Sequence, residues 1–379
     1  MAKFKFLQFG AVMSLFTAPV VVASCSKEEK TIKLIVNKPW YGTEKHEFFN
    51  KIAEIYNSKD ENKQKIKIEV NYSNDNNNLA NNVIKGTSDI AVITTSLFNA
   101  GDNPNLLLPL IQTTTRAFNF DKHISYYENG TENGPLRTIA NKAYRLFSEK
   151  PYAEWTNSEY QWNGSIYQKF YAELNDRVSY YRGLVMLQGN EEEINQITEA
   201  WNNKDWNTFR NFGIVTGDNT SGSKYLLQEA LFKKHFNKPN NLFISFANDK
   251  INHSEKYMTG KPRDIGQGAL QNFHIVFDEL GSFGYTNNTK GGKLLNYYKP
   301  SKPDAKISFL TTTGPLNYSI FAASKLLPKD IAEAFSKALI EAWEQGEDDY
   351  GPTVGFNGYK LITNAKNQVI DPFTKVMGS

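Results

Sequence analysis

The apolar residues of the first hundred positions alternate between two periods, and no other feature limits the fold of this chain as strongly. They recur every second residue in 31–37 and 65–72, which is typical of strands. They have the 3.6-residue period of a helix in 43–58, where Thr43 is the expected N-cap. A short helix over 77–85 and a buried strand over 90–95 complete the pattern. This β-α-β-α-β order predicts a parallel sheet with right-handed crossovers.

The rest of the chain continues the mixture of strands and helices without an internal repeat. We expect strands at 178–188, 211–216, 271–278, 306–312 and 318–323, helices at 134–148, 190–209 and 329–345, an extended stretch at 113–120 and a loop at 287–303. The chain of 379 residues is longer than one typical core requires, so two domains are expected.

These elements predict an α/β fold of two lobes. Lobe 1 is expected at 31–125 and is completed by 305–379, because the last helix needs the strands of the first unit. Lobe 2 is expected at 126–304, with an aromatic-rich insertion at 151–171. Two lobes joined in this way leave a ligand cleft between them, at the carboxyl ends of the strands.

The N-terminus has the features of a lipoprotein signal peptide. Lys3 and Lys5 precede an apolar run over 6–22, and small residues precede Cys25, the only cysteine of the chain. We expect a signal peptide over 1–24, a lipid on Cys25, and a polar tether over 25–30 that holds the protein at the extracellular face of the membrane. The alternative is an ordinary signal peptide with an incidental cysteine. Removing Lys3 and Lys5 leaves a net charge near neutral, which gives no reason to expect a nucleic-acid partner.

The stretch GDNTSGSKYLLQEALF, residues 217–232, is predicted to bind an anion. Its first six residues match a phosphate loop, but Ser223 and Lys224 then stand in reversed order, so we reject nucleotide binding of that type. Free N–H groups at a helix start still favour an anion. Thr220, Ser221 and Ser223 are expected to donate to phosphate oxygens, and Gly222 to let the backbone approach. The alternative is that Thr220 or Ser221 is only an N-cap.

Aromatic residues beside glycines follow two of the expected strands. Trp40 and Tyr41 lie in KPWYG (38–42), and GSFGY (281–285) follows the acidic end of another strand. Aromatic rings at strand ends are suited to stacking on a flat ligand, and they attract a ring that is cationic. The residues expected at this ring site are Trp40, Tyr41, Glu279, Ser282, Phe283 and Tyr285, with Glu279 accepting from an amino group. Core packing is the alternative for Trp40 and Phe283.

Catalytic and metal-binding patterns are poor. The five histidines are scattered without metal-ligand spacing, and no Gly-x-Ser-x-Gly elbow is present. The acidic run at 347–349 follows a helix and is expected to form a solvated face. We therefore expect neither an enzyme nor a metal site.

Several segments resemble one family. They are PYAEW (151–155), QWNGSIYQ (161–168), YYRG (180–183), AWNNKDWNTFRNFGI (200–214), FHIVFDELGSF (273–283) and DDYGPTVGFNGYK (348–360). Through these segments, the chain resembles the extracytoplasmic thiamine-binding lipoproteins of mycoplasmas. The resemblance implies a type II periplasmic-binding fold and a monomeric solute-binding subunit of an ABC importer. It implies thiamine or thiamine pyrophosphate as transported ligand, and a permease and an ATPase as partners.

Other functions remain compatible with the residues. A phosphonate or phosphate would use the anion turn without ring stacking, and a surface adhesin would bind no small molecule. A surface hydrolase is disfavoured by the missing catalytic groups. Arg182 and Arg210 are expected either to contact the ligand or to fasten the lobes.

Overall fold

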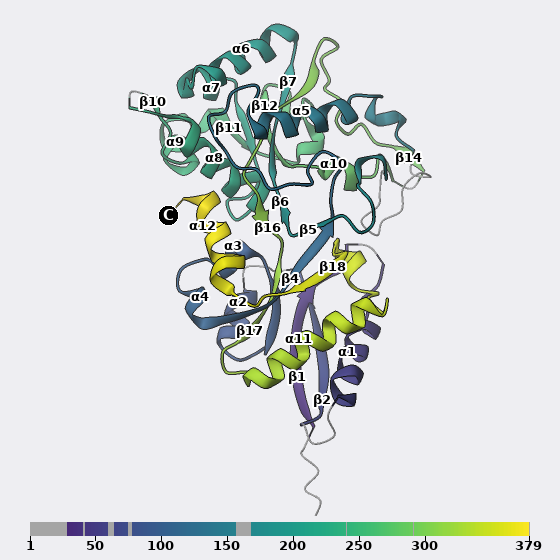
Figure 1. Ribbon diagram of the computed structural model, residues 1–379. Helices are drawn as coiled ribbons and strands as arrows, with labels where there is room; N and C mark the ends of the chain where they lie inside the picture. Colours follow the sequence, from purple (N-terminus) through teal and green to yellow (C-terminus); the bar gives the residue numbers. More distant parts are fainter. Residues whose placement is uncertain are drawn as a thin grey trace, which may run out of the picture.

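Two sheets divide the chain into two lobes, one above the other in Figure 1. The computed structural model describes residues 29–40, 42–59, 64–74, 78–156, 168–239, 241–290 and 292–378. The predicted signal peptide, Cys25, most of the predicted tether, Tyr41 and nearly all of the segment 161–168 lie outside these ranges. The predicted two-lobed α/β fold of the periplasmic-binding type is confirmed.

The sheet of lobe 1 contains the predicted parallel unit. Its strands run in the order β2 (Ile66–Ser73), β1 (Lys30–Asn37), β3 (Ile90–Ile93), β17 (Ile320–Ser324), β4 (Leu107–Arg116) and β18 (Gly358–Leu361), and β5 (Arg177–Val178) pairs with β4. β1 is parallel to β2 and β3, whereas β17 is antiparallel to both of its neighbours. The strand inserted between β3 and β4 therefore comes from the far end of the chain.

Apolar helices cover both faces of this sheet. α1 (Glu47–Ser58) and α11 (Lys329–Glu344) pack against each other over one face, and α2 (Leu79–Ile84) lies on the other. α3 (Thr95–Phe98) and α4 (Asn103–Leu106) follow β3 directly. Each face has its own buried aliphatic and aromatic cluster.

The start of α1 differs from the prediction. The helix begins at Glu47 with His46 as N-cap, rather than at Thr43. Its second backbone N–H, that of Phe48, donates to the carboxylate of Asp349 at 3.2 Å. Asp349, which is distant in the sequence, thus accepts a hydrogen bond from the start of α1, where the N-cap side chain makes none. The acidic run at 347–349 is accordingly not the solvated face that we predicted.

Lobe 2 repeats the plan of lobe 1. Its strands run in the order β11 (Tyr257–Thr259), β8 (Ile214–Thr216), β12 (Ile275–Glu279), β7 (Gly183–Gly189) and β15 (Lys306–Thr312). β7 is antiparallel to both β12 and β15, so it occupies the place that β17 has in lobe 1. Because β15 pairs in this sheet, the chain returns to lobe 1 after Thr312, later than the predicted boundary at 305.

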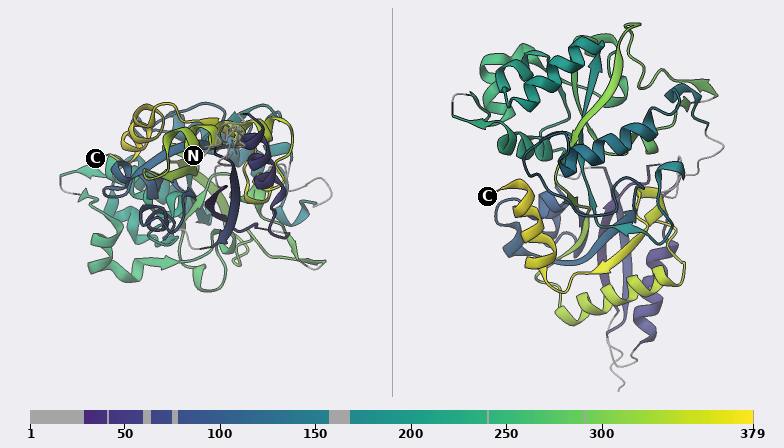
Figure 2. Two further views of the ribbon diagram at one scale, coloured as in Figure 1. Left: turned by 90° about the horizontal axis from the view of Figure 1, so that it is seen from below. Right: turned by 45° about the horizontal axis from the view of Figure 1, so that its top comes forward.

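The helices of lobe 2 lie on both faces of its sheet (Figure 2). α5 (Pro135–Phe147), predicted at 134–148, packs on β15, and α6 (Glu191–Asn202), α7 (Trp206–Asn211), α8 (Leu227–His235) and α9 (Phe246–His253) complete the lobe. The helix predicted over 190–209 is broken between α6 and α7. Lys204 has a φ of 54°, and Asp205 then caps α7 by accepting from the N–H of Thr208.

The described ends of the aromatic insertion, 151–156 and 168–171, contribute to the core. Trp155, Phe170 and Tyr171 are buried in one cluster with residues of α5 and β12. The remaining short strands and α-helices of the described ranges are β6 (Tyr180–Tyr181), β9 (Asn237–Lys238), β10 (Asn241–Leu242), α10 (Ser282–Tyr285), β13 (Thr289–Lys290), β14 (Lys293–Leu294), β16 (Leu316–Asn317) and α12 (Asp371–Met377). No helix within the described ranges combines the length and apolarity needed to cross a bilayer.

The chain crosses between the lobes near β6 and β16, in a region that we call the waist. There β6 pairs antiparallel with β16, and Arg182 lies next to this ribbon with its side chain fully buried. Its Nε contacts Asp121 Oδ2 at 2.9 Å, and its Nη1 donates to the carbonyls of Ser125 at 2.8 Å and Thr313 at 3.1 Å. Arg182 therefore fastens the crossing segments to one another.

Arg210 has a role inside one lobe. Its Nη1 lies 2.9 Å from Asp249 Oδ1, and Trp206 Nε1 and the hydroxyl of Tyr257 donate to the same carboxylate. The network joins α7, α9 and β11. Neither Arg182 nor Arg210 lines the two cavities described next.

Candidate functional site

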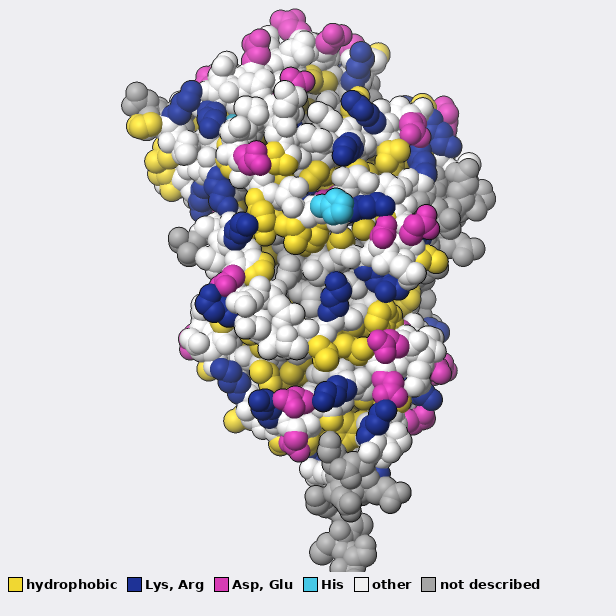
Figure 3. Space-filling view, viewed as in Figure 1, with side chains coloured by type: hydrophobic (Ala, Val, Ile, Leu, Met, Phe, Trp, Pro, Cys, Tyr) yellow, Lys and Arg dark blue, Asp and Glu magenta, His cyan; other side chains and the backbone are white. Residues whose placement is uncertain are grey.

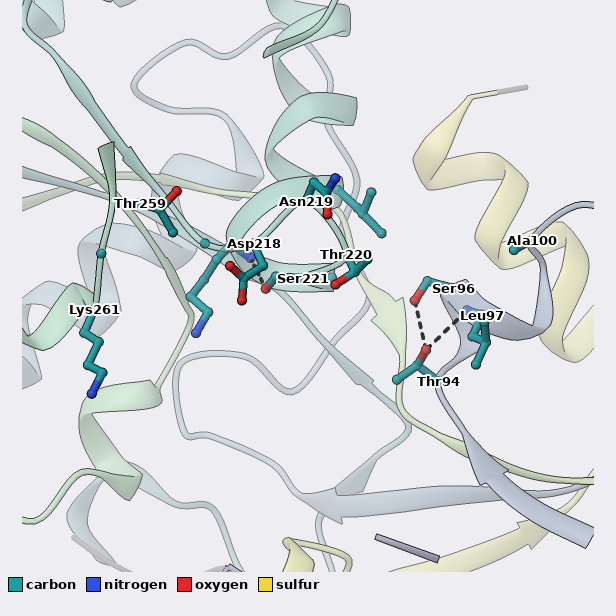
Figure 4. A pocket seen from close by; sticks show the side chains of 15 residues that line it. Thr94, Ser96, Leu97, Ala100, Asp218, Asn219, Thr220, Ser221, Thr259 and Lys261 are labelled. Carbon is teal, nitrogen blue, oxygen red and sulfur yellow. Dashed lines mark hydrogen bonds between the residues drawn. The ribbon is translucent and has the colours of Figure 1, made fainter. Parts of the chain in front are cut away.

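Two neighbouring cavities lie between the lobes, at the carboxyl ends of strands from both sheets. We call them the anion chamber, of about 770 Å³, and the ring chamber, of about 320 Å³; Thr94 lines both. The anion chamber is lined by Thr94, Ser96, Leu97, Ala100, Gly217, Asp218, Asn219, Thr220, Ser221, Gly222, Lys224, Leu226, Thr259, Gly260 and Lys261 (Figure 4). The ring chamber is lined by Asn37, Trp40, Val92, Thr94, Thr115, Tyr181, Glu279, Tyr285, Asn317, Tyr318, Ser319, Val354, Gly355 and Phe356.

The predicted anion turn forms the lobe 2 wall of the anion chamber. It follows β8 and continues through a π-helical turn, Gly222–Leu226, into α8. Ser221 is the N-cap, since its Oγ accepts from the N–H of Lys224 at 3.3 Å. The capping alternative is therefore correct for Ser221, although this residue also lines the chamber. Thr220 lines it as well and is exposed.

Two residues of the turn have structural roles that the sequence did not suggest. A Cβ on Gly222 would lie 2.1 Å from the hydroxyl oxygen of Tyr181, so the absent side chain makes room for a tyrosine of the waist. Ser223 is buried and lines neither chamber, and its hydroxyl opposes the rise of the pKa of the neighbouring Glu279 carboxyl group. The structure therefore corrects the prediction that Ser223 donates to phosphate. Instead, Ser223 connects the turn with the ring chamber.

Lobe 1 contributes a second hydroxyl wall that the sequence analysis missed. Thr94 is the N-cap of α3, where its Oγ1 accepts from the N–H of Leu97 at 3.2 Å and lies 3.1 Å from Ser96 Oγ. In Figure 4 these side chains stand on the opposite side of the chamber from Thr220 and Ser221. Three successive hydroxyl residues, Thr94, Thr95 and Ser96, directly after a buried strand were the available signal.

Two lysines give the anion chamber positive charge. Lys224 belongs to the anion turn, and Lys261 follows the end of β11 on a third side of the chamber (Figure 4). Asp218 is the one acidic side chain among the described lining residues. Hydroxyl groups on two walls and an excess of ammonium groups suit an anion such as phosphate or diphosphate.

The ring chamber brings together three of the residues predicted for ring binding. Trp40, Glu279 and Tyr285 all line it, and Tyr181, Tyr318 and Phe356 add further aromatic rings. Trp40 as a whole residue is 64% exposed, which is unusual for tryptophan and excludes the core-packing alternative for this residue. The rings of Tyr181 and Tyr318 lie 5.2 Å apart between centroids.

The other residues predicted for this site lie elsewhere. Phe283 is fully buried in the aromatic core of lobe 2, beside Phe147, Phe170 and Phe309, so ring stacking is wrong for it and core packing is correct. Ser282 begins α10 and interacts with Asp278 and Tyr298 instead of lining either chamber.

Burial controls the charges around the ring chamber. It raises the pKa of Glu279, while the hydrogen bond from Ser223 and the charge of Lys224 oppose this rise. It also raises the pKa of Tyr285 to about 12 and the pKa values of Tyr181 and Tyr318. The phenols are therefore neutral at physiological pH, and one carboxyl group stands among aromatic rings. This arrangement can hold a flat cationic ring that carries an amino group.

A turn near the C-terminus shapes the outer side of the ring chamber. Asp348 accepts from the N–H of Gly351 at 2.7 Å and from the hydroxyl of Tyr359 at 2.8 Å. Phe356 is then held by a backbone hydrogen bond to the carbonyl of Gly351. Among the described residues, no group of three or more His, Cys, Asp and Glu side chains is placed to hold a metal ion.

Comparisons with known proteins give the family. The model of the family described as extracytoplasmic thiamine-binding lipoprotein (CypI) matches residues 43–378. A Mesomycoplasma hyorhinis protein named high affinity transport system protein p37 is 35% identical over 277 residues, which cover 73% of this chain and 66% of that protein. A Mycoplasma pneumoniae protein of the same name is 30% identical and covers 98% of this chain and 97% of its own length.

A solved structure agrees with these sequence relationships. Mh-p37 of Mycoplasma hyorhinis, described as a proposed thiamine pyrophosphate transporter, superposes with a TM-score of 0.81 at 30% identity. The match covers 92% of this chain and 98% of that one. The chain therefore belongs to the extracytoplasmic thiamine-binding lipoproteins, a family of solute-binding transport proteins.

Proposed function

We propose that this protein is the lipid-anchored, extracellular solute-binding subunit of an ABC importer, and that it binds thiamine pyrophosphate or thiamine between its lobes. The observation that carries the proposal is the contact between the two chambers at Thr94. One chamber offers hydroxyl and ammonium groups, and the other offers aromatic rings and Glu279. Thiamine pyrophosphate has a diphosphate at one end and a cationic thiazolium with an aminopyrimidine at the other.

The roles of the residues follow from their places in the chambers. Thr220, Ser221, Lys224 and Lys261 would hold the diphosphate from lobe 2, and Thr94 with Ser96 from lobe 1. Trp40, Tyr285 and Phe356 would enclose the rings, and Glu279 would pair with the pyrimidine. Because both lobes contribute to each chamber, the ligand would favour the arrangement in which the lobes approach each other.

The proposal includes delivery to a membrane permease. Cys25 would carry the lipid that keeps the protein at the membrane, and a permease with its ATPase would accept the ligand. Figure 3 shows basic and acidic side chains interspersed over the viewed face of both lobes. Such a surface fits a protein partner better than a nucleic acid.

Ligand-dependent stability tests the proposal. The protein is unfolded and refolded to remove bound ligand, and its thermal midpoint is measured with thiamine pyrophosphate, thiamine, diphosphate and methylphosphonate in turn. A ligand at about one hundred times its dissociation constant adds about 2.7 kcal/mol, so binding is visible. We expect a large shift with thiamine pyrophosphate and a small one with diphosphate. A shift with methylphosphonate alone would instead identify a phosphonate-binding subunit, and no shift with any compound would contradict small-molecule transport.

A further inference from the structure

The C-terminal helix α12 connects the two lobes at a place outside the waist ribbon, as Figures 1 and 2 show. The helix continues from a π-helical turn, Lys366–Ile370, whose Val369 is buried in a core cluster of lobe 1. The Nδ2 of Asn317 also donates to the carbonyl of Gln368 at 2.8 Å. The first end of α12 is therefore fixed to lobe 1 and the waist.

The other end of α12 contacts α8 of lobe 2. Val376 is buried against Leu227 and Leu316. Lys234 Nζ, in the last turn of α8, donates to the carbonyl oxygens of Lys375 at 3.0 Å and Val376 at 2.7 Å. Carbonyl groups at the end of a helix have no partner within the helix, and they carry the negative end of its dipole. The ammonium group of Lys234, on the opposite lobe, thus donates hydrogen bonds to these carbonyl groups and compensates the negative end of the dipole.

The helix that α12 holds is the continuation of the anion turn. Leu227 is the first residue of α8, directly after the π-helical turn that lines the anion chamber. The same apolar cluster includes Tyr181, which lines the ring chamber and whose hydroxyl occupies the space beside Gly222. A displacement of α12 from α8 would therefore move the turn relative to Thr94 and Ser96 on lobe 1.

We propose that Lys234 and Val376 are positioning residues for ligand binding: they hold the anion turn of lobe 2 at the distance from Thr94 and Ser96 that a diphosphate requires. The inference rests on the proposed function. It adds that α12 affects the anion chamber through its contact with α8, without touching the ligand. The contact matters most for ligands that must reach both hydroxyl walls. A ligand without phosphate, which occupies only the ring chamber, depends on it less.

Titration calorimetry with matched variants tests this inference. Lys234→Met removes the contact, Lys234→Arg retains a donor, and Lys233→Met is the control, because Lys233 pairs with Glu229 on the same helix. We expect Lys234→Met to weaken thiamine pyrophosphate binding about tenfold or more, the change that corresponds to one charge-assisted hydrogen bond. Thiamine binding should change by less than about threefold, within ordinary surface effects. Lys234→Arg should restore affinity, and Lys233→Met should have no effect. Equal losses for both ligands, or none, would overturn the inference.

A measurement that needs no ligand separates this inference from the proposed function. The full-length chain with Cys25→Ser has no native thiol, so spin labels are attached at Lys337→Cys on α11 and Asn195→Cys on α6, both exposed. We expect the distribution of distances between the labels to broaden in Lys234→Met and to stay unchanged in Lys233→Met. Identical distributions in all variants would contradict the role of α12. If the wild-type chain bound neither thiamine compound, the proposed function would fail, and the distances alone would decide whether α12 positions the lobes.

Discussion

Single residues beside the cleft combine burial with charge, and Asp278 is the clearest case. Burial raises the pKa of its carboxyl group to about 7, partly opposed by the hydrogen bond from the N–H of Glu279 and by the charge of Lys224. Between about pH 4 and pH 7, the Asp278 carboxyl group is therefore protonated in the folded state and ionised in the unfolded chain. This acid stabilises the fold most at low pH, and its contribution falls as the pH rises through the folded pKa.

The variant Asp278→Asn tests this effect. We expect the free energy of unfolding of the wild-type protein to fall between pH 4 and pH 8 more steeply than that of the variant, by at most about 4 kcal/mol, since one unit of pKa corresponds to about 1.4 kcal/mol. Denaturant unfolding without ligand measures both profiles. Asp330→Asn, an exposed change on α11, serves as control. Parallel profiles for wild type and Asp278→Asn would show that this carboxyl group is ionised equally in both states.

Trp40 gives a second prediction at this scale. Its ring is exposed and lines the ring chamber, so Trp40→Ala should weaken both thiamine and thiamine pyrophosphate by roughly 5- to 30-fold, the range expected for a cation over an indole ring. Diphosphate binding and the thermal midpoint of the ligand-free protein should change little. Leu326→Ala, which alters an even more exposed apolar residue of the same lobe, provides the comparison. Unchanged thiamine affinity in Trp40→Ala would remove this residue from the site.

We expect the lysine that follows β11 at the cleft to contribute to the preference of the anion chamber for phosphate groups. Lys261 follows β11 and faces the anion chamber, whereas Lys256 precedes the same strand outside it. We expect Lys261→Met to weaken thiamine pyrophosphate about tenfold at low salt, with a smaller effect at high salt where charges are screened, and to leave thiamine unaffected. Calorimetry at two salt concentrations measures this, with Lys256→Met as control. Similar behaviour of the two variants would indicate only a general effect of net charge.

The elements also show how far sequence patterns reach. Periodicity predicted the parallel unit of lobe 1 and the main helices, but it did not predict β11 or β18 and reached only the end of β4. Strand-end aromatics predicted that Trp40, Glu279 and Tyr285 converge. Sequence patterns did not predict contacts between distant segments. The Asp349 carboxylate accepts a hydrogen bond at the start of α1, and the hydroxyl of Tyr181 occupies the space that Gly222 leaves open. The hydroxyl wall of Thr94 and Ser96 was missed because its meaning depends on the opposite lobe. Local patterns describe an element well, but they do not show which element faces it.

At the scale of the whole molecule, the lobes depend on the buried ion pair at the waist. Arg182→Met would leave the buried Asp121 carboxyl group without its cation, a loss of about 3–5 kcal/mol for such a pair. Because Arg182 also holds the crossing segments, we expect the two lobes to unfold in separate calorimetric transitions. Arg210→Met, which breaks a pair inside lobe 2, should lower stability while unfolding remains a single transition. A single transition in both variants would contradict the role of Arg182 at the waist.

The insertion of a late strand into the sheet of lobe 1 has a consequence for folding during synthesis. β17, near residue 320, lies in the middle of the lobe 1 sheet between strands that are synthesised some two hundred positions earlier. The first half of the chain therefore leaves β3 and β4 with open edges until the last quarter arrives. Such long-range pairing slows folding and exposes aggregation-prone strands. We therefore expect lobe 1 to form only after nearly the whole chain has been synthesised, so that the strand order itself delays folding.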